Sequence, residues 1–335
     1  MITISIIIVN YNGRRFLERL FATLNDQTFK NFEVIFVDND SKDDSVDFIR
    51  QNYSEAKIVR LKNLGFGTGC NIGAESATGK YLIFLNEDMY LPEDFLEKII
   101  AFRASLDKNN NKKIGGISCN LINFDSDPQE VRENYGASID LFGFPVKGKN
   151  PEDIFAISGS PFFIAKEVFQ AAGGFNENIF LYGEDIDLSW RLKIFGFNNF
   201  VFQQTQIFHY GGGTTGFFGP EKISENIFSS YIPMITNYKL LTLIFLIPFY
   251  FIYLTAVTLV IFIGKQFDGH YVIAILTKLG MILRNMKKIL SFRKFVQSKR
   301  VKSDIFIFRY ISLIPAFLQN KSYKKLLNNY MIKNC

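Results

Sequence analysis

Cysteine and histidine are scarce in this chain, and their placement excludes several kinds of site. The three cysteines, Cys70, Cys119 and Cys335, lie far apart and show no metal-ligand spacing. This excludes a disulfide framework and a cysteine-rich zinc site, and it predicts free thiols in a reducing compartment. Of the two histidines, His209 stands before three consecutive glycines, whereas His270 has no such setting.

The first residues lack the marks of a secretory signal. The chain begins MITISIIIVNYNG, with no basic residue before a short β-branched run, so we expect a first strand there. The run also lacks the G-x-G-x-x-G turn of a dinucleotide-binding fold, because residues 10–13 supply only one glycine.

Acidic residues are nearly absent from the end of the chain. Residues 265–335 hold fifteen Lys or Arg against Asp268 and Asp304, a net charge of +13, whereas the whole chain carries +6. Residues 240–264 contain no charge over 25 positions, more than the roughly 20 residues that cross a bilayer core. We therefore expect a membrane segment, followed by a basic amphipathic tail that binds an anionic membrane surface and not nucleic acid.

In the first 90 residues, β-branched or apolar runs alternate with amphipathic stretches. This rhythm predicts an α/β fold with a parallel sheet and right-handed crossovers. Three of the four predicted strands end in polar residues at one edge of the sheet, where ligands of such folds collect. The predicted strands are residues 3–9, 33–37, 57–61 and 81–85, and the polar clusters are residues 10–12, 38–41 and 86–88.

The carboxylates at this edge favour a particular ligand. Asp38, Glu87 and Asp88 would repel a bare diphosphate unless a divalent cation lay between them. Solvation of the loops and capping of the next helix is the alternative. The glycine-rich residues 63–73 allow close approach of a phosphate to the following helix, or they only make a tight turn.

Four motifs in order along the chain resemble the inverting family 2 glycosyltransferases, and among them the rhamnosyltransferase-like enzymes. They are IIIVNYNG at 6–13, VDNDSKDDS at 37–45, NLGFGTGCNIG at 63–73 and FLNEDM at 84–89. The resemblance covers about residues 2–218. It implies a GT-A fold, a Rossmann-like nucleotide-diphospho-sugar transferase domain, over residues 1–225, and a membrane-associated helical region over 226–335.

The resemblance also implies roles for matching residues. Asp88 and His209 would bind Mg²⁺ or Mn²⁺, which neutralises the departing diphosphate. The segment 86–88 departs from the Asp-x-Asp or Asn-Pro-Asp that is more usual in the family, which leaves the part of Glu87 open. The residues expected to contact the nucleotide sugar or its acceptor are Tyr11, Asn12, Asp38, Asn39, Asn63, Gly65, Asn71, Asn86, Glu87 and Gly159.

A second acidic cluster opens a predicted helix that ends at Gly196. Glu184, Asp185 and Asp187 lie in its first turn, where the helix dipole is expected to keep them ionised. Capping explains one of the three, and an ionised carboxylate at a site edge can accept a proton from a hydroxyl. The resemblance makes Asp185 the catalytic base and gives Glu184 a part in placing the acceptor.

These assignments predict inverting transfer of a sugar from a nucleoside diphosphate donor to a hydroxyl of a lipid-linked saccharide in cell-surface glycan synthesis. L-rhamnose as the sugar rests on the resemblance alone. The alternatives are a polyprenyl-phosphate sugar transferase and a non-catalytic membrane scaffold that keeps a nucleotide-binding fold.

The expected location is the cytoplasmic face of the cell membrane, because the nucleotide-sugar supply and the basic tail both favour that side. A single crossing at residues 240–264 would separate the tail from the catalytic domain. Either Pro248 bends the segment into a re-entrant hairpin, or a second span exists at residues 271–283 or 305–318.

Overall fold

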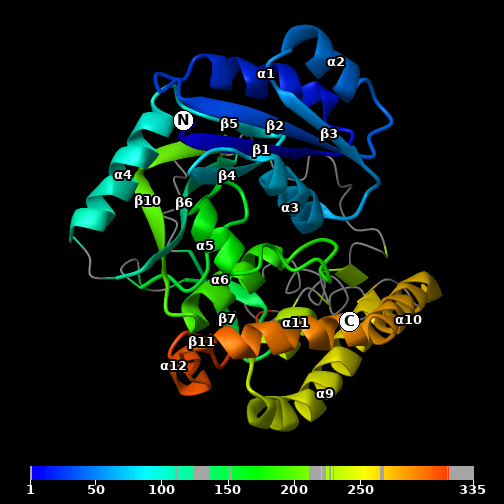
Figure 1. Ribbon diagram of the computed structural model, residues 1–335. Coiled ribbons are helices and arrows are strands. Elements are labelled where there is room, and N and C mark those ends of the chain that lie inside the picture. Colours follow the sequence, from blue (N-terminus) through cyan, green and yellow to red (C-terminus); the bar gives the residue numbers. More distant parts are fainter. Residues whose placement is uncertain are drawn as a thin grey trace, which may run out of the picture.

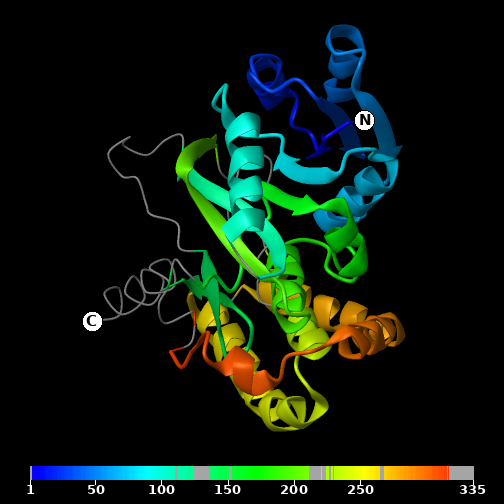
Figure 2. The same cartoon turned by 60° about the vertical axis from the view of Figure 1, so that its left-hand side comes forward.

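The computed structural model shows a large mixed sheet flanked by helices, with a small sheet and the C-terminal helices beside it (Figure 1). Figure 2 turns the molecule so that α4 lies in front of the large sheet. The residues that the structure describes are 2–109, 112–123, 136–148, 150, 153–210, 220, 224, 225, 228, 230–264, 268–314 and 316.

Four parallel strands form one half of the large sheet. In spatial order they are β3 (Lys57–Leu61), β2 (Phe32–Asn39), β1 (Ile4–Asn10) and β4 (Tyr81–Asn86). They are connected in sequence by the helices α1 (Arg14–Asn25), α2 (Ser45–Asn52) and α3 (Phe66–Ser76). The predicted alternation of strands and helices is therefore confirmed.

Both faces of this half are covered, because successive side chains of a strand point to opposite faces. Ile6 and Ile8 of β1 pack in the cluster that contains α1 and α2, whereas Ile7 and Val9 pack in the cluster that contains α3. Figure 1 shows α1 and α2 above the sheet and α3 below it. A ligand therefore has to approach at an edge of the sheet, and the polar residues stand at the carboxyl edge.

The other half of the sheet is not parallel throughout. β9 pairs antiparallel with β4 and β6, β6 runs parallel to β10, and the short β5 pairs antiparallel with β10. The strand predicted near 154–165 is limited to its last four residues, because Ile154 and Ala156 make only isolated bridges. These strands are β9 (Phe162–Ala165), β6 (Ile114–Asn123), β10 (Asn198–His209) and β5 (Met89–Tyr90).

After β4 the chain forms the short strand β5, and α4 begins at Phe95. The predicted acidic helix begins at Glu184, and Gly196 follows its end with a left-handed φ of +89°. The remaining elements are α4 (Phe95–Asn109), β7 (Ala137–Asp140), β8 (Pro145–Lys147), α5 (Lys166–Ala171), α6 (Glu184–Ile194), α8 (Tyr231–Asn237), α9 (Leu240–Gly264), α10 (Gly269–Arg284), α11 (Met286–Lys299), α12 (Asp304–Phe308) and β11 (Ile311–Ser312).

The C-terminal helices share an apolar core with the large sheet. One cluster contains Leu188 and Trp190 of α6 together with Tyr238 and Tyr250, and the ring centroids of Trp190 and Tyr238 are 4.7 Å apart. Residues on both sides of the predicted boundary at 225 therefore pack together. The boundary itself stays a prediction.

The uncharged segment forms one continuous helix, α9, through Pro248, so a re-entrant hairpin is not formed. In the described part of the chain, one helix, over residues 240–259, is long and apolar enough to cross a membrane by length and composition. The second span expected at 305–318 is wrong, because Ile311–Ser312 pairs in parallel with β7 in the small sheet; residues 317 and 318 lie outside the described residues.

Candidate functional site

The strand register brings the predicted polar residues to one edge. Asn10 of β1 is the register partner of Asp38 of β2, and Val9 is the partner of Asn86 of β4. Asn10, Asp38, Glu87 and Asp88 are all buried. The ends of β1, β2 and β4 therefore supply one continuous polar rim.

Asp88 and His209 meet at this rim although 120 positions separate them in sequence. Their Oδ1 and Nε2 atoms are 3.3 Å apart. The pairing of β5 with β10 sets Met89 opposite His209, and the N–H of Tyr210 donates to the carbonyl of Asp88 at 3.1 Å. The three glycines that follow, at 211–213, lie outside the described residues.

This pair fits a divalent cation. The Oδ1 atom of Asp88 is buried and receives no hydrogen bond. Two neighbouring ligand atoms of an octahedral ion, each about 2.1 Å from it, lie roughly 3 Å apart, close to the separation found here. No group of three His, Cys, Asp or Glu side chains that could hold a metal occurs among the described residues, so the other ligands would be substrate oxygens and water.

Asn10 belongs to the polar cluster expected at residues 10–12, but no role of its own was predicted for it. Its Nδ2 donates to Ser41 Oγ at 2.9 Å, while its buried Oδ1 receives no hydrogen bond. Gly13 leaves no room beside it, since a Cβ on Gly13 would lie 2.5 Å from Asn10 Oδ1 and 2.4 Å from Glu87 Cγ. Its position as the last residue of a buried strand, opposite Asp38, was the available signal.

The loops after β1 and β2 are tied together by Ser41. Its Oγ accepts from the N–H of Asn12 at 3.0 Å, and Asn12 Oδ1 accepts from the N–H of Lys42 at 2.7 Å. Asp38 accepts from the N–H of Ser41 at 3.2 Å and lies 3.5 Å from Arg60 Nε. Tyr11, in the turn after β1, is 40% exposed.

Two of the asparagines predicted to contact the nucleotide sugar, Asn39 and Asn63, hold the glycine-rich loop. Asn39 Nδ2 donates to Asn63 Oδ1 at 3.1 Å, and Asn39 Oδ1 accepts from the N–H of Leu64 at 3.2 Å. Asn63 Oδ1 also accepts from the N–H of Gly65 at 3.2 Å. These contacts fix the conformation of the loop that leads into α3, so these side-chain amides determine the shape of the loop.

Asn71 is likewise engaged with the protein, and its predicted contact with the nucleotide sugar stays a prediction. Its Nδ2 donates to the carbonyl of Phe175 at 2.9 Å, and its Oδ1 accepts from the N–H of the same residue at 2.8 Å. Gly65 makes a second tight contact with this segment, because a Cβ there would lie 2.2 Å from the carbonyl oxygen of Phe180. Its φ of +92° also suits glycine. Residues 175–180 are thereby held against the glycine-rich loop.

Asp185 stands at the start of α6 and is linked to the metal-ligand pair. Its Oδ2 accepts from the N–H of Gly159 at 2.9 Å, and its Oδ1 accepts from the N–H of Ile186 at 2.7 Å. The neighbouring Ser160 accepts through Oγ from the N–H of Asn86 at 2.7 Å. Residues 159 and 160 therefore join Asp185 to the segment that carries Asp88.

The two carboxyls at the start of α6 have different surroundings. Burial, together with the adjacent Asp185, raises the pKa of Glu184 to about 8. The Oε2 of Glu184 receives no hydrogen bond. Burial also raises the pKa of Asp185 above the ordinary aspartate value, and backbone N–H donors, among them Ile186 and Gly159, offset this rise only in part. The expectation that the helix dipole keeps all three acids ionised is therefore wrong for Glu184, and at Asp185 the dipole and the donors act against burial.

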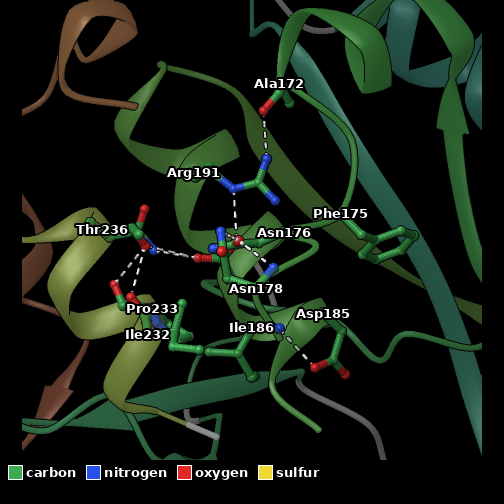
Figure 3. A network of polar contacts seen from close by, with 12 residues as sticks. Ala172, Phe175, Asn176, Asn178, Asp185, Ile186, Arg191, Ile232, Pro233 and Thr236 are labelled. Carbon is green, nitrogen blue, oxygen red and sulfur yellow. Dashed lines mark hydrogen bonds and ion pairs between the residues drawn. The ribbon is translucent and has the colours of Figure 1, made fainter. Parts of the chain in front are cut away.

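Asp187 belongs to a buried network and not to the open site. Its Oδ2 lies 2.8 Å from Arg191 Nε, and both side chains are fully buried. Its Oδ1 accepts from Thr236 Oγ1 at 3.2 Å and from Asn237 Nδ2 at 3.0 Å. Figure 3 shows this network on one side of α6 with Asp185 turned away from it. The network fixes α6 against α8.

A groove of about 230 Å³ lies beside the glycine-rich loop. Leu64 and Phe180 line one side, and Met281, Lys288 and Ile289 from α10 and α11 line the other. Leu64 and Phe180 are both exposed. The groove therefore extends from the edge of the candidate site to the C-terminal helices.

The fold and part of the sequence are similar to those of known glycosyltransferases. Residues 5–111 match the family model described as Glycosyl transferase family 2. This match covers the strands β1 to β5 and both acidic clusters that end β2 and β4. The large sheet and its helices form a mixed α/β, GT-A-like glycosyltransferase fold.

Two relatives show how far the similarity extends. An uncharacterized glycosyltransferase of Haemophilus influenzae is 35% identical over 103 residues, which are 30% of this chain and 41% of that protein. An uncharacterized glycosyltransferase of Rickettsia prowazekii is 26% identical over 250 residues, which are 71% of this chain and 74% of that protein. This chain therefore matches less than half of the length of the Haemophilus relative.

Two solved structures share the fold. S. aureus TarS 1-349 in complex with UDP-GlcNAc has a TM-score of 0.54 and 15% identity, with 89% of this chain and 91% of that chain covered. GalNAc-T7 with UDP, GalNAc and Mn²⁺ has a TM-score of 0.56 and 16% identity, with 70% of this chain and 48% of that chain covered.

Proposed function

We propose that this protein is an inverting glycosyltransferase that moves a sugar from a nucleoside diphosphate donor to a hydroxyl of a lipid-linked saccharide. The observation that carries the proposal is the connection of Asp185 through Gly159 and Ser160 to the segment of Asp88 and His209. A proton acceptor and a pair of metal ligands thus border one rim, which is the arrangement that such a transfer requires. The family match over residues 5–111 and the UDP complexes of the structural neighbours support the donor class.

In this mechanism, Asp185 accepts the proton of the acceptor hydroxyl. The oxygen forms a bond to the anomeric carbon from the face opposite the diphosphate, and the bond from that carbon to the diphosphate oxygen breaks with its electron pair. The single displacement inverts the anomeric configuration. The N–H groups of Gly159 and Ile186 hold both oxygens of Asp185 in place, so that the lone pairs facing the site are fixed.

Asp88 and His209 would hold Mg²⁺ or Mn²⁺, which when bound neutralises the charge of the departing diphosphate. Asp38 and Tyr11 border the place of the ribose and base. The raised pKa of Glu184 keeps its carboxyl group neutral at pH 7, so it adds no negative charge to the rim. The neutral carboxyl can position an acceptor hydroxyl by hydrogen bonding.

The acceptor would approach from the groove between Phe180 and α10–α11. Apolar side chains on both walls suit the start of a lipid chain, and Lys288 suits the phosphate that joins the lipid to its saccharide. This route keeps the enzyme on the cytoplasmic face of the membrane, where nucleotide sugars are supplied. L-rhamnose as the transferred sugar stays a prediction.

The test is donor turnover with the purified full chain across a panel of sugar nucleotides that includes UDP-GlcNAc and an L-rhamnose donor. Asp185→Asn should lower kcat by about 10²- to 10⁴-fold with donor binding kept. Asp88→Ala should abolish the effect of Mn²⁺ on nucleotide binding, measured by calorimetry. Glu18→Gln, an exposed carboxylate change on α1, is the matched control and should leave both unchanged.

The outcomes separate the alternatives. Full activity of Asp185→Asn on a polyprenyl phosphate, which needs no deprotonation, would replace the proposal with a polyprenyl-phosphate sugar transferase. Metal-dependent nucleotide binding without turnover of any donor would leave a non-catalytic scaffold.

A further inference from the structure

The helix α9 has one face packed on the protein and one face exposed. Leu243, Tyr250, Leu254 and Val257 are buried, at the spacing of one helix face. The ring of Tyr250 lies 5.7 Å from that of Phe142 and contacts the α8 side as well. At about 1.5 Å per residue, the contact from 243 to 257 runs along roughly 21 Å of the helix.

Polar groups of the protein body lie directly against this contact. Asp304, near the start of α9, accepts from Thr242 Oγ1 at 2.6 Å and pairs with Arg300. Asp140 lies buried in the turn that carries Phe142 and accepts from the N–H of that residue at 2.9 Å. A helix that crossed the bilayer would carry these charged groups toward the hydrocarbon, which opposes a crossing.

The opposite face of α9 is apolar and open. Leu241, Phe245, Phe249, Ile252 and Leu259 are each more than half exposed. Such a row of large side chains is too extensive for a surface that meets only water. Figure 1 shows α9 at the lower boundary of the molecule, with α10 beside it.

The helix α10 continues the apolar face and adds positive charge. Ile273, Leu276 and Leu283 are each more than half exposed, and Arg284 and Lys287 are exposed where α10 meets α11. Basic side chains beside an exposed apolar face suit an anionic lipid surface. A second copy of the chain would instead bring two tails of net charge +13 together.

We propose that α9 and α10 lie flat in one leaflet of an anionic bilayer, with the exposed row Leu241–Leu259 in the lipid and the catalytic sheet and basic tail on the same side. The helix α9 thus attaches the protein without crossing the membrane. A single crossing would place the catalytic domain and the basic tail on opposite sides of the membrane. A helix that lies in one leaflet leaves both on the same side, so neither has to be translocated. The inference rests on the proposed membrane attachment and not on glycosyl transfer. A negative result in the membrane experiments therefore leaves the proposed transfer untouched, and loss of the proposed transfer leaves this inference untouched.

The depth of nitroxide labels in vesicles tests the orientation. Cys335→Ser first removes the tail thiol, because Cys70 and Cys119 are buried. Labels on L241C, I252C and L259C should lie at one shallow depth, whereas a label on L254C should show no contact with lipid. A crossing helix would place Ile252 far deeper than Leu241 and Leu259, and that profile would overturn the proposal.

Flotation with vesicles tests the occupant. Ile252→Glu should weaken binding to phosphatidylcholine vesicles that contain phosphatidylglycerol by roughly tenfold, since it removes one buried apolar side chain and adds a charge. Val301→Glu changes an exposed apolar residue outside α9 and α10 and should leave binding unchanged. Unchanged far-UV circular dichroism and melting would show that both variants fold. Absence of flotation with wild type, or a dimer in sedimentation that Ile252→Glu dissociates, would assign the face to a second copy instead.

Discussion

The two halves of the candidate site are held in different ways. On the nucleotide side, Ser41 and Asn39 connect loops that directly follow neighbouring strands, so the contacts are short-range in the fold. On the acceptor side, Asp185 depends on α6, which is fixed by residues of α8 about 50 positions later. The helix α11 then fixes α8, since Gln297 Nε2 donates to the carbonyl of Thr236 at 2.8 Å.

This difference parallels the extent of the family match, which ends at residue 111. A binding edge built from strand ends and adjacent loops can be kept in many proteins, because each loop needs only its neighbours. The proposed base, Asp185, is held through three helices, so it needs a particular packing of α6, α8 and α11. The comparison therefore predicts that damage far from the rim weakens the acceptor side more than the nucleotide side.

The largest effect is expected from the buried ion pair. Asp187→Ala should lower the free energy of unfolding by about 3–5 kcal/mol, because Arg191 would stay buried without its partner. Urea unfolding measures the loss. The double variant Asp187→Leu with Arg191→Met should recover much of it, since no charge is then buried. Equal instability of the double variant would contradict this account.

A smaller effect is expected on the nucleotide side from Gly13→Ala. Its Cβ would overlap Glu87 Cγ and Asn10 Oδ1, which costs about 1–3 kcal/mol if the neighbours shift. Nucleotide affinity, measured by calorimetry, should fall while the pH profile of turnover stays the same. Gly280→Ala is the control, because a Cβ there meets no atom within 4 Å. A similar loss of nucleotide affinity in both variants would contradict the assignment of the effect to the contacts of Gly13.

The sequence located the polar edge of the sheet better than the surroundings of Asp185, for a physical reason. Strand ends such as Asn10 and Asp38 can be located from β-branched runs, since parallel strands share an edge. The two-residue strand that aligns Asp88 with His209 is too short for a periodic signal; the expectation that they meet came from the family resemblance. Nothing local to Asp187 indicated that its partners would be Thr236 and Asn237.

The burial of a charged side chain cannot be predicted from a sequence pattern, and Glu184 is an example. The helix dipole favours its ionised form, but removal from water outweighs the dipole and raises its pKa to about 8. The native state therefore binds this proton more tightly than the unfolded chain. Its contribution to stability is present below pH 4.5, the ordinary glutamate value, and is lost as pH rises toward about 8.

Glu184→Gln tests whether burial on the acceptor side has this effect on the pH dependence of stability. The variant should flatten the fall of the free energy of unfolding between pH 4.5 and about 8, a slope of about 1.4 kcal/mol per pH unit at most. Urea unfolding across that window measures it. Glu18→Gln, on the exposed face of α1, should keep the wild-type slope. The same slope in wild type and Glu184→Gln would show that the carboxyl is not protonated in the native state.

The smallest effect should come from the groove that leads to the acceptor side. Lys288 is exposed there, and one lysine near an anionic group contributes about 1 kcal/mol, so Lys288→Gln should raise KM for a lipid-linked acceptor roughly fivefold. The kcat and the donor KM should stay unchanged, because the rim is untouched. Lys294→Gln removes an exposed charge of the same helix outside the groove and should leave all three constants unchanged. Equal rises for both variants would assign the effect to general attraction by the basic tail, and a rise in the donor KM would place Lys288 on the nucleotide side.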